Sequence, residues 1–130
     1  MAAGADLGIA PHGLDTLFTC RLEKGHIIVG MDTEGDSHVY RVGMEWAARM
    51  DKPDFVGKPA LVRLAKLPID RKLVGLVTDG PAPIEGAVLW DRDQTTGYVT
   101  GSRYSPALGH AVMLGWVKLV DGALPDQVRL

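Results

Sequence analysis

The residue of this 130-residue chain best suited to ligand chemistry is an arginine near the end of an amphipathic segment. Arg21 is followed by Glu23, Lys24 and Gly25. A guanidinium can hold a planar carboxylate or carbonyl group through two parallel hydrogen bonds, so Arg21 is a candidate clamp for an anionic ligand. The alternative interpretation is an arginine–glutamate pair at the surface, which would contribute little stability. The residues alone leave both interpretations open.

The other polar residues do not combine into a catalytic or metal-binding pattern. Residues 32–36 are rich in carboxylates, but an EF-hand loop starting at Asp32 would need a glycine where Ser37 stands and a carboxylate where Gly43 stands. We therefore interpret this segment as a solvated acidic loop. The four histidines lack the spacing of a helical zinc site, and no nucleophile elbow or glycine-rich phosphate loop is present. We predict neither catalytic residues nor a metal site.

Composition narrows the class of protein further. The single cysteine, Cys20, cannot form a disulfide within the chain, and we predict a partly buried structural role for it. A lone cysteine is typical of a reducing compartment, so the sequence favours a cytoplasmic protein. The net charge of −2 gives no reason to expect nucleic acid or an anionic membrane as a partner. No apolar run approaches the roughly 20 residues that span a bilayer.

Apolar spacing predicts the elements that position Arg21. Apolar residues at positions 14, 17, 18 and 22 form one helical stripe, which predicts a helix over residues 14–24 with Gly25 as its C-cap. The small residues 1–13 and the polar residues 31–40 are typical of loops. Alternation over residues 42–50 indicates a strand, although Ala47 and Ala48 leave a helix possible. Pro59 starts a helix that ends at residue 66, before Pro68.

The second half of the chain has a different pattern of apolar and turn-forming residues. Short apolar runs separated by turn clusters predict strands at residues 72–77, 87–90, 97–100 and 111–119, with a further strand beginning at 128–130. This spacing is typical of a small antiparallel barrel or sandwich. We therefore predict an α+β fold with two domains, a mixed segment at residues 1–68 and an incomplete β-barrel at residues 69–130.

Several short sequence motifs follow one another along the chain. The first is Arg21-Leu22-Glu23-Lys24-Gly25 within residues 13–25, followed by the run at residues 26–35 that reads H-I-I-V-G-M-D-T-E-G. Further segments lie at residues 46–47, 52–58, 72–76, 85–87, 97–101 and 104–109. Together they resemble the C-terminal part of the glycine cleavage T-protein, or aminomethyltransferase, family. The sequence of residues 21–35 resembles more specifically the sequences of the sarcosine oxidase alpha subunit branch.

The resemblance implies a partial aminomethyltransferase fold and a role in one-carbon metabolism. Proteins of this family bind tetrahydrofolate in a central channel and transfer a methylene unit to it from an amine. In the sarcosine oxidase branch the amine is N-methylated, and FAD, FMN or NAD would lie only in partner regions. Arg21 matches the arginine of the "R-L-E-x-G" motif that contacts folate. The resemblance therefore implies Arg21 and Glu23 of that motif as folate-binding residues.

The resemblance also has departures that bear on partners. Met31 stands where the sarcosine oxidase branch has glutamine, and Ala107 where threonine is usual. The folate-facing aspartate of the family's N-terminal portion has no counterpart, so we expect an incomplete folate channel and partners such as other subunits, a missing segment or a second copy. Three hypotheses remain: part of an enzyme, a non-catalytic folate-binding or subunit-assembly module, and a remnant that associates through unpaired strand edges.

Overall fold

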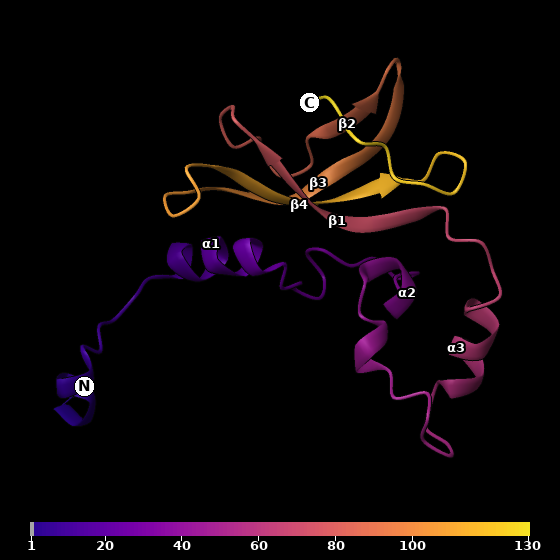
Figure 1. Ribbon diagram of the computed structural model, residues 1–130, viewed down its shortest axis with the longest axis horizontal. Coiled ribbons are helices and arrows are strands. Elements are labelled where there is room, and N and C mark those ends of the chain that lie inside the picture. The colour runs from indigo at the N-terminus through magenta and orange to yellow at the C-terminus, as the bar shows by residue number, and fades with distance from the viewer. Residues whose placement is uncertain (1) are drawn as a thin grey trace.

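The computed structural model describes residues 2–130 and places helices before strands along the chain (Figure 1). The helical elements are η1 (Ala2–Leu7), α1 (Leu14–Lys24), α2 (Val39–Val42), η2 (Glu45–Ala47) and α3 (Lys58–Leu64). The strands are β1 (Arg71–Thr78), β2 (Val88–Asp91), β3 (Gln94–Ser105) and β4 (His110–Lys118). The predicted α+β class is confirmed.

The strands form one open antiparallel sheet in the order β1-β4-β3-β2. β2, β3 and β4 follow one another as hairpins, whereas β1 crosses over to pair with β4 over its full length. The four strands that the sequence predicts are confirmed, although β3 is much longer than residues 97–100. Arg129 forms an isolated antiparallel bridge with Trp90 of β2, and the strand predicted to begin at residues 128–130 is not formed within the described residues.

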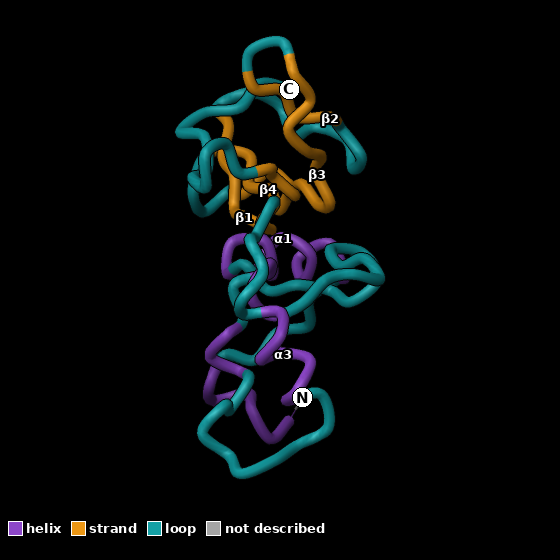
Figure 2. The backbone as a smooth tube through the Cα atoms, turned by 90° about the vertical axis from the view of Figure 1, so that its right-hand side faces the viewer, coloured by secondary structure: helices purple, strands orange, loops and turns teal. Residues whose placement is uncertain are grey.

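The core is divided between the two faces of this sheet, because successive side chains of a strand point to opposite sides. On one face, Leu22 of α1 packs with buried side chains of β1 and β4; this cluster comprises Leu22, Leu73, Val112, Leu114 and Trp116. On the other face lies a second cluster of Leu89, Val99, Met113 and Val117. Figure 2 shows the helices gathered on one side of the sheet. Each fully buried side chain of this size contributes about 1.5–3 kcal/mol.

Helix α1 has the bounds that its sequence predicts. Asp15 lies in the first turn and Lys24 in the last, where each complements the helix dipole. Gly25 ends the helix in the left-handed region at φ 75°, and its N–H donates to the Leu22 carbonyl at 3.1 Å. Only the end of the apolar stripe reaches the sheet, since Leu22 is buried while Leu14 is exposed. Cys20 is exposed, so the prediction of a partly buried cysteine is wrong.

Three further predictions need correction. Residues 42–50 do not form a strand, because Gly43 ends α2 in a left-handed conformation at φ 70° and η2 follows at once. The N-terminal segment is not wholly a loop, since residues 2–7 form a 3-10 helix. The loop predicted at residues 31–40 gives way to α2 at Val39. The helix predicted at residues 59–66 is confirmed with shifted ends, as Lys58–Leu64.

Gly97 allows the closest approach between two strands. A Cβ at this position would lie 1.7 Å from the Trp116 carbonyl oxygen, which belongs to the backbone of the paired strand and cannot rotate away.

We therefore expect Gly97→Ala to destabilise the fold by at least about 3 kcal/mol in urea denaturation. Gly75→Ala is the matched control in β1, because a Cβ there meets nothing within 4 Å. Equal midpoints for the two variants would contradict this strand pairing.

Candidate functional site

The guanidinium of Arg21 is buried between α1 and the sheet. Arg21 is only 7% exposed, and its Nη1 donates to Asp32 Oδ2 at 2.6 Å and to the His26 carbonyl at 3.3 Å. The interpretation of Arg21 as part of a surface arginine–glutamate pair is therefore wrong. Its partner is an aspartate in the loop after α1, which the turn at Gly25 brings back beneath the helix end.

Asp32 connects four parts of the chain. Its side chain is fully buried. Oδ2 accepts the Ile28 N–H at 2.7 Å as well as Arg21, and Oδ1 accepts the Thr100 hydroxyl of β3 at 2.5 Å. Its backbone carbonyl accepts Trp116 Nε1 of β4 at 3.0 Å. The interpretation of residues 32–36 as a solvated acidic loop is thus wrong for Asp32, whose burial is tolerated because both carboxylate oxygens have donors.

The guanidinium is held on one side only. Its two hydrogen bonds to other described residues both leave from Nη1, whereas Nε is buried and has no acceptor within the described chain. Nη2 lies against Gly101 of β3, where a Cβ would approach it to 2.6 Å. Gly101 therefore leaves the space that the end of the arginine occupies. Nε is therefore a buried donor of Arg21 that no acceptor among the described residues uses.

Glu23, the other residue implied by the motif, is fixed by a different partner. Its Oε1 accepts the Ser105 hydroxyl at 2.6 Å, and Ser105 itself is fully buried at the end of β3. The Ser105 oxygen also accepts the Leu108 N–H at 3.1 Å, which closes the turn before β4. Within residues 2–130, no hydrogen bond or ion pair joins Arg21 to Glu23. The structure thus holds each of the two residues separately against the sheet.

An exposed group of charges attaches the loop after α1 to β1. Arg71 donates to Glu34 at 2.6 Å and to Asp36 at 3.1 Å, and its guanidinium stacks over the Trp116 ring at 5.0 Å. The Tyr98 hydroxyl donates to Glu34. This hydrogen bond and then Arg71 lower the pKa of Glu34, whereas burial and then the bond to Glu34 raise the pKa of Tyr98 to about 12.

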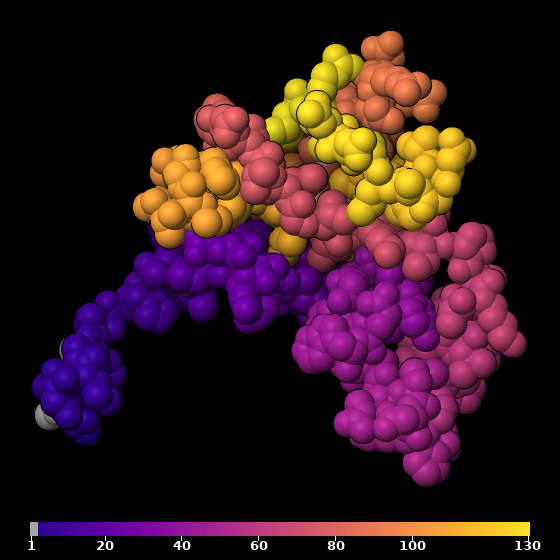
Figure 3. All heavy atoms as spheres, in the orientation of Figure 1, coloured from indigo at the N-terminus to yellow at the C-terminus, as the bar shows by residue number. Residues whose placement is uncertain are grey.

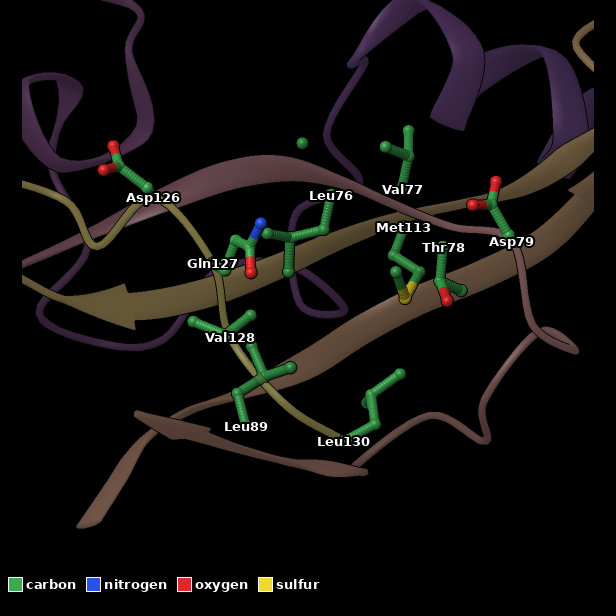
Figure 4. Close-up of a pocket in the computed structure, with 11 residues that line it drawn as sticks. Leu76, Val77, Thr78, Asp79, Leu89, Met113, Asp126, Gln127, Val128 and Leu130 are labelled. Atoms are coloured by element: carbon green, nitrogen blue, oxygen red, sulfur yellow. The ribbon is translucent and has the colours of Figure 1, made fainter. Parts of the chain in front are cut away.

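A separate hollow of about 680 Å³ lies on the far face of the sheet (Figure 4). Leu76, Leu89, Met113 and Val128 form its apolar part, and Asp79 and Asp126 flank it. Figure 4 shows the segment from Asp126 to Leu130 crossing this face of the sheet. Neither Arg21 nor Glu23 lines the hollow, so the sheet separates it from the buried arginine.

Comparison with known protein families covers both halves of the chain. Residues 1–52 match the family model described as the GCVT N-terminal domain, and residues 71–128 match the glycine cleavage T-protein C-terminal barrel domain. The chain belongs to the glycine cleavage T-protein family. The open sheet β1–β4 is thus the part of the barrel domain that lies within residues 71–118, and the resemblance of the motifs is confirmed.

The relatives of this chain include aminomethyltransferases and a sarcosine oxidase subunit alpha. An aminomethyltransferase of Halothermothrix orenii is 37% identical over 98% of this chain and 36% of its own length. A sarcosine oxidase subunit alpha of a Corynebacterium species is 38% identical over 90% of this chain and 13% of its own. The solved glycine cleavage system aminomethyltransferase T of Bartonella henselae superposes with a TM-score of 0.72 at 30% identity, covering 82% of this chain and 31% of that one. The chain therefore spans about a third or less of these relatives.

The described residues, 2–130, hold neither a membrane-spanning helix nor a cluster of metal ligands. None of the described helices is long and apolar enough to cross a membrane. Within the same residues, no three or more histidine, cysteine or acidic side chains gather as they would around a metal ion.

Removing the Asp32 charge tests the buried pair directly. Asp32→Asn keeps the shape of the side chain but leaves the Arg21 charge buried without a counter-ion, so we expect a loss of about 3–5 kcal/mol in unfolding free energy. Thr100→Val, which removes one hydrogen bond to the same carboxylate, should cost about 1.5–3 kcal/mol. Asp51→Asn breaks the exposed pair with Arg49 and serves as the control, with no measurable change. An unchanged midpoint for Asp32→Asn would rule out the pair.

The raised pKa of Tyr98 has a testable dependence on pH. The neutral hydroxyl is stabilised in the fold, so its contribution is fully present below the ordinary pKa of 10.0 and is lost as pH rises toward about 12. Ultraviolet titration of the wild type minus Tyr98→Phe should show a tyrosinate transition near pH 12. A difference transition centred at the ordinary pKa would show that the bond between Tyr98 and Glu34 does not form in solution.

Proposed function

We propose that this chain forms a folate-contacting part of a tetrahydrofolate-dependent aminomethyl-transfer protein. Membership of the T-protein family supports this proposal, as do relatives named aminomethyltransferase. The observation that carries it is the state of Arg21, which Asp32 fixes through Nη1 while its Nε keeps no acceptor among the described residues. A buried donor without an acceptor is costly, and a ligand oxygen that reached Nε through a shift of the neighbouring side chains would remove that cost.

The donors that Arg21 retains suit the chemistry of folate. A reduced folate carries a benzoyl carbonyl and glutamate carboxylates, and a fixed guanidinium holds such planar oxygens well. When bound, tetrahydrofolate supplies the nitrogen atoms that take up the one-carbon unit. Arg21 would hold the carbonyl or carboxylate end, and Glu23, oriented by Ser105, would accept N–H groups of the ligand.

The remaining residues of the site act by placing Arg21. Asp32 balances its charge, so a neutral carbonyl as well as a carboxylate can be bound without a large excess of positive charge. Thr100 and the Ile28 N–H keep the Asp32 carboxylate from rotating. Gly101 leaves the space in which the guanidinium lies against β3.

The finer reaction is a further part of the proposal. We infer that the amine is an N-methyl amine, as in the sarcosine oxidase branch, because the relative from Corynebacterium carries that name and the wording of residues 21–35 resembles it. FAD, FMN or NAD would then act in partner regions. Because the chain covers 36% and 13% of the two relatives, other polypeptide would supply the rest of the folate channel, and a cytoplasmic location fits a chain with one unpaired cysteine.

A subunit-assembly role is the second candidate, and the helical part of the chain favours it. Among residues 3–70 only Arg21, Leu22 and Asp32 are buried. Large apolar side chains there remain exposed, including Leu14, Val29 and Trp46, which is 77% exposed. Figure 3 shows the N-terminal segment and residues 40–66 projecting from the sheet on either side of α1. Such a surface is typical of one that another polypeptide covers.

Titration with 5-formyltetrahydrofolate, a stable reduced folate, tests the proposal. Saturable binding followed by calorimetry is expected for the wild type, and Arg21→Ala should weaken it at least tenfold, or about 1.4 kcal/mol. Arg21→Lys should recover little, because an ammonium cannot replace the planar fork. Arg49→Ala removes one exposed arginine elsewhere and should bind as the wild type does.

Two outcomes would contradict the folate proposal. The first is the absence of saturable binding by the folded wild type. The second is equal affinity for the wild type and Arg21→Ala, with circular dichroism showing that both are folded. Binding without turnover of sarcosine, even after addition of the N-terminal portion of a relative, would favour the assembly role.

A further inference from the structure

His38 lies where three segments of the helical half of the chain meet. Its carbonyl accepts the Arg41 N–H at 2.9 Å, which starts α2. Its ring meets the ring of Tyr40 edge-on, with 5.7 Å between the ring centres and 67° between the planes. The Tyr40 hydroxyl donates to the Leu61 carbonyl of α3 at 3.3 Å. This contact joins α2 to α3, which lies away from the sheet in Figure 1.

A small cavity of about 180 Å³ lies between the His38 ring and the segment that follows α3. Its apolar wall comes from the end of α3 and the residues after it, namely Leu64, Leu67, Pro68 and Ile69. Nδ1 of His38 is buried and has no hydrogen-bond partner among the described residues. Burial without a partner penalises a charged ring more than a neutral one, so this surrounding favours the neutral imidazole.

The charged groups around the His38 ring are already paired with one another. Arg41 donates to Asp36 at 2.5 Å and to Asp70 at 2.7 Å, and Arg71 also donates to Asp36 at 3.1 Å. The loop after α1, helix α2 and the segment before β1 thus each present one of the charges that act on His38. The adjacent tyrosine is the other titratable neighbour, and the wall after α3 is apolar. A protonated ring would therefore be a second cation beside Arg41.

The titration of His38 agrees with this geometry. Burial, and then the charge of Arg41, lower the pKa of His38 below its ordinary value of 6.5, while Asp36 and Asp70 act in the opposite direction. The neutral form is therefore the one that the fold stabilises. Its contribution is fully present above the ordinary pKa and is lost as pH falls below 6.5 through the lowered pKa.

We propose that His38 is a proton-sensitive contact that holds α3 and residues 64–70 against α2 only while its imidazole is neutral. The protonated ring has an N–H donor at each nitrogen, and Nδ1 finds no acceptor in the cavity. The ring then moves out to water, the apolar wall loses its partner, and α3 separates from α2. Every group that contacts the ring lies within residues 36–70, so the contact is complete without another polypeptide. The proposal does not depend on folate binding.

Nuclear magnetic resonance titration of the full chain tests the histidine itself. His38→Phe identifies the ring-proton signal of His38 by removing it. In the wild type this signal should change with a midpoint below pH 6.5, because burial and Arg41 oppose the charge. A midpoint at or above 6.5 would overturn the proposal.

Hydrogen exchange tests the consequence for α3. After correction for the pH dependence of the chemical step, the α3 amides of the wild type should exchange at least about threefold faster at pH 5.5 than at pH 7.5. His38→Phe keeps an aromatic ring in the cavity but cannot take up a proton, so it should remove this difference. His12→Phe changes an exposed histidine before α1 and should retain it. Equal exchange of the wild type at both pH values, or a difference that His38→Phe leaves in place, would contradict the proposed contact.

Discussion

The Asp32 carboxylate is the group on which the arrangement of helix and sheet depends. A fully buried carboxylate is costly to desolvate, and here its charge is offset by Arg21 of α1, the Ile28 N–H and the Thr100 hydroxyl of β3. Its own backbone carbonyl meets the indole of β4. The helix, the loop and the two strands therefore supply hydrogen-bond partners for one another's buried polar groups. Removing any one of these groups would leave a buried polar partner without a hydrogen bond in an apolar surrounding.

The sequence predicts those features that local patterns determine. Helix α1 has its predicted bounds because an apolar stripe and Gly25 act within a few residues of each other, and the strands have a clear period between turn clusters. The strand prediction for residues 42–50 is wrong because alternation over so short a stretch also fits a helical turn. Gly43 ends α2 there in a left-handed conformation. The exposure of Cys20 depends on which side of α1 meets the sheet, which spacing alone does not determine.

The sequence points to Arg21 and Glu23 as candidate site residues, but not to the residues that hold Arg21 in place. Arg21 is conspicuous as a potential clamp, but its partner Asp32 stood in a polar segment that looked solvated. The groups that bury Asp32 are Thr100 and Trp116, which lie 68 and 84 positions further along the chain. Pairings over such separations are made by the topology of the sheet and leave no periodic signal. Gly101 is a further example, since its role depends on an arginine that arrives from another element.

The bond between Trp116 and the Asp32 carbonyl also gives the chain an internal optical reporter. Trp116 is 1% exposed, while Trp46 is 77% and Trp90 40% exposed. A water-soluble quencher would therefore reduce the fluorescence of Trp46 and Trp90 more than that of Trp116, whose indole lies under Arg71. The emission that survives would come from the place where the loop after α1 meets the sheet. Its colour and lifetime would follow the docking of that loop in a chain that carries no added label.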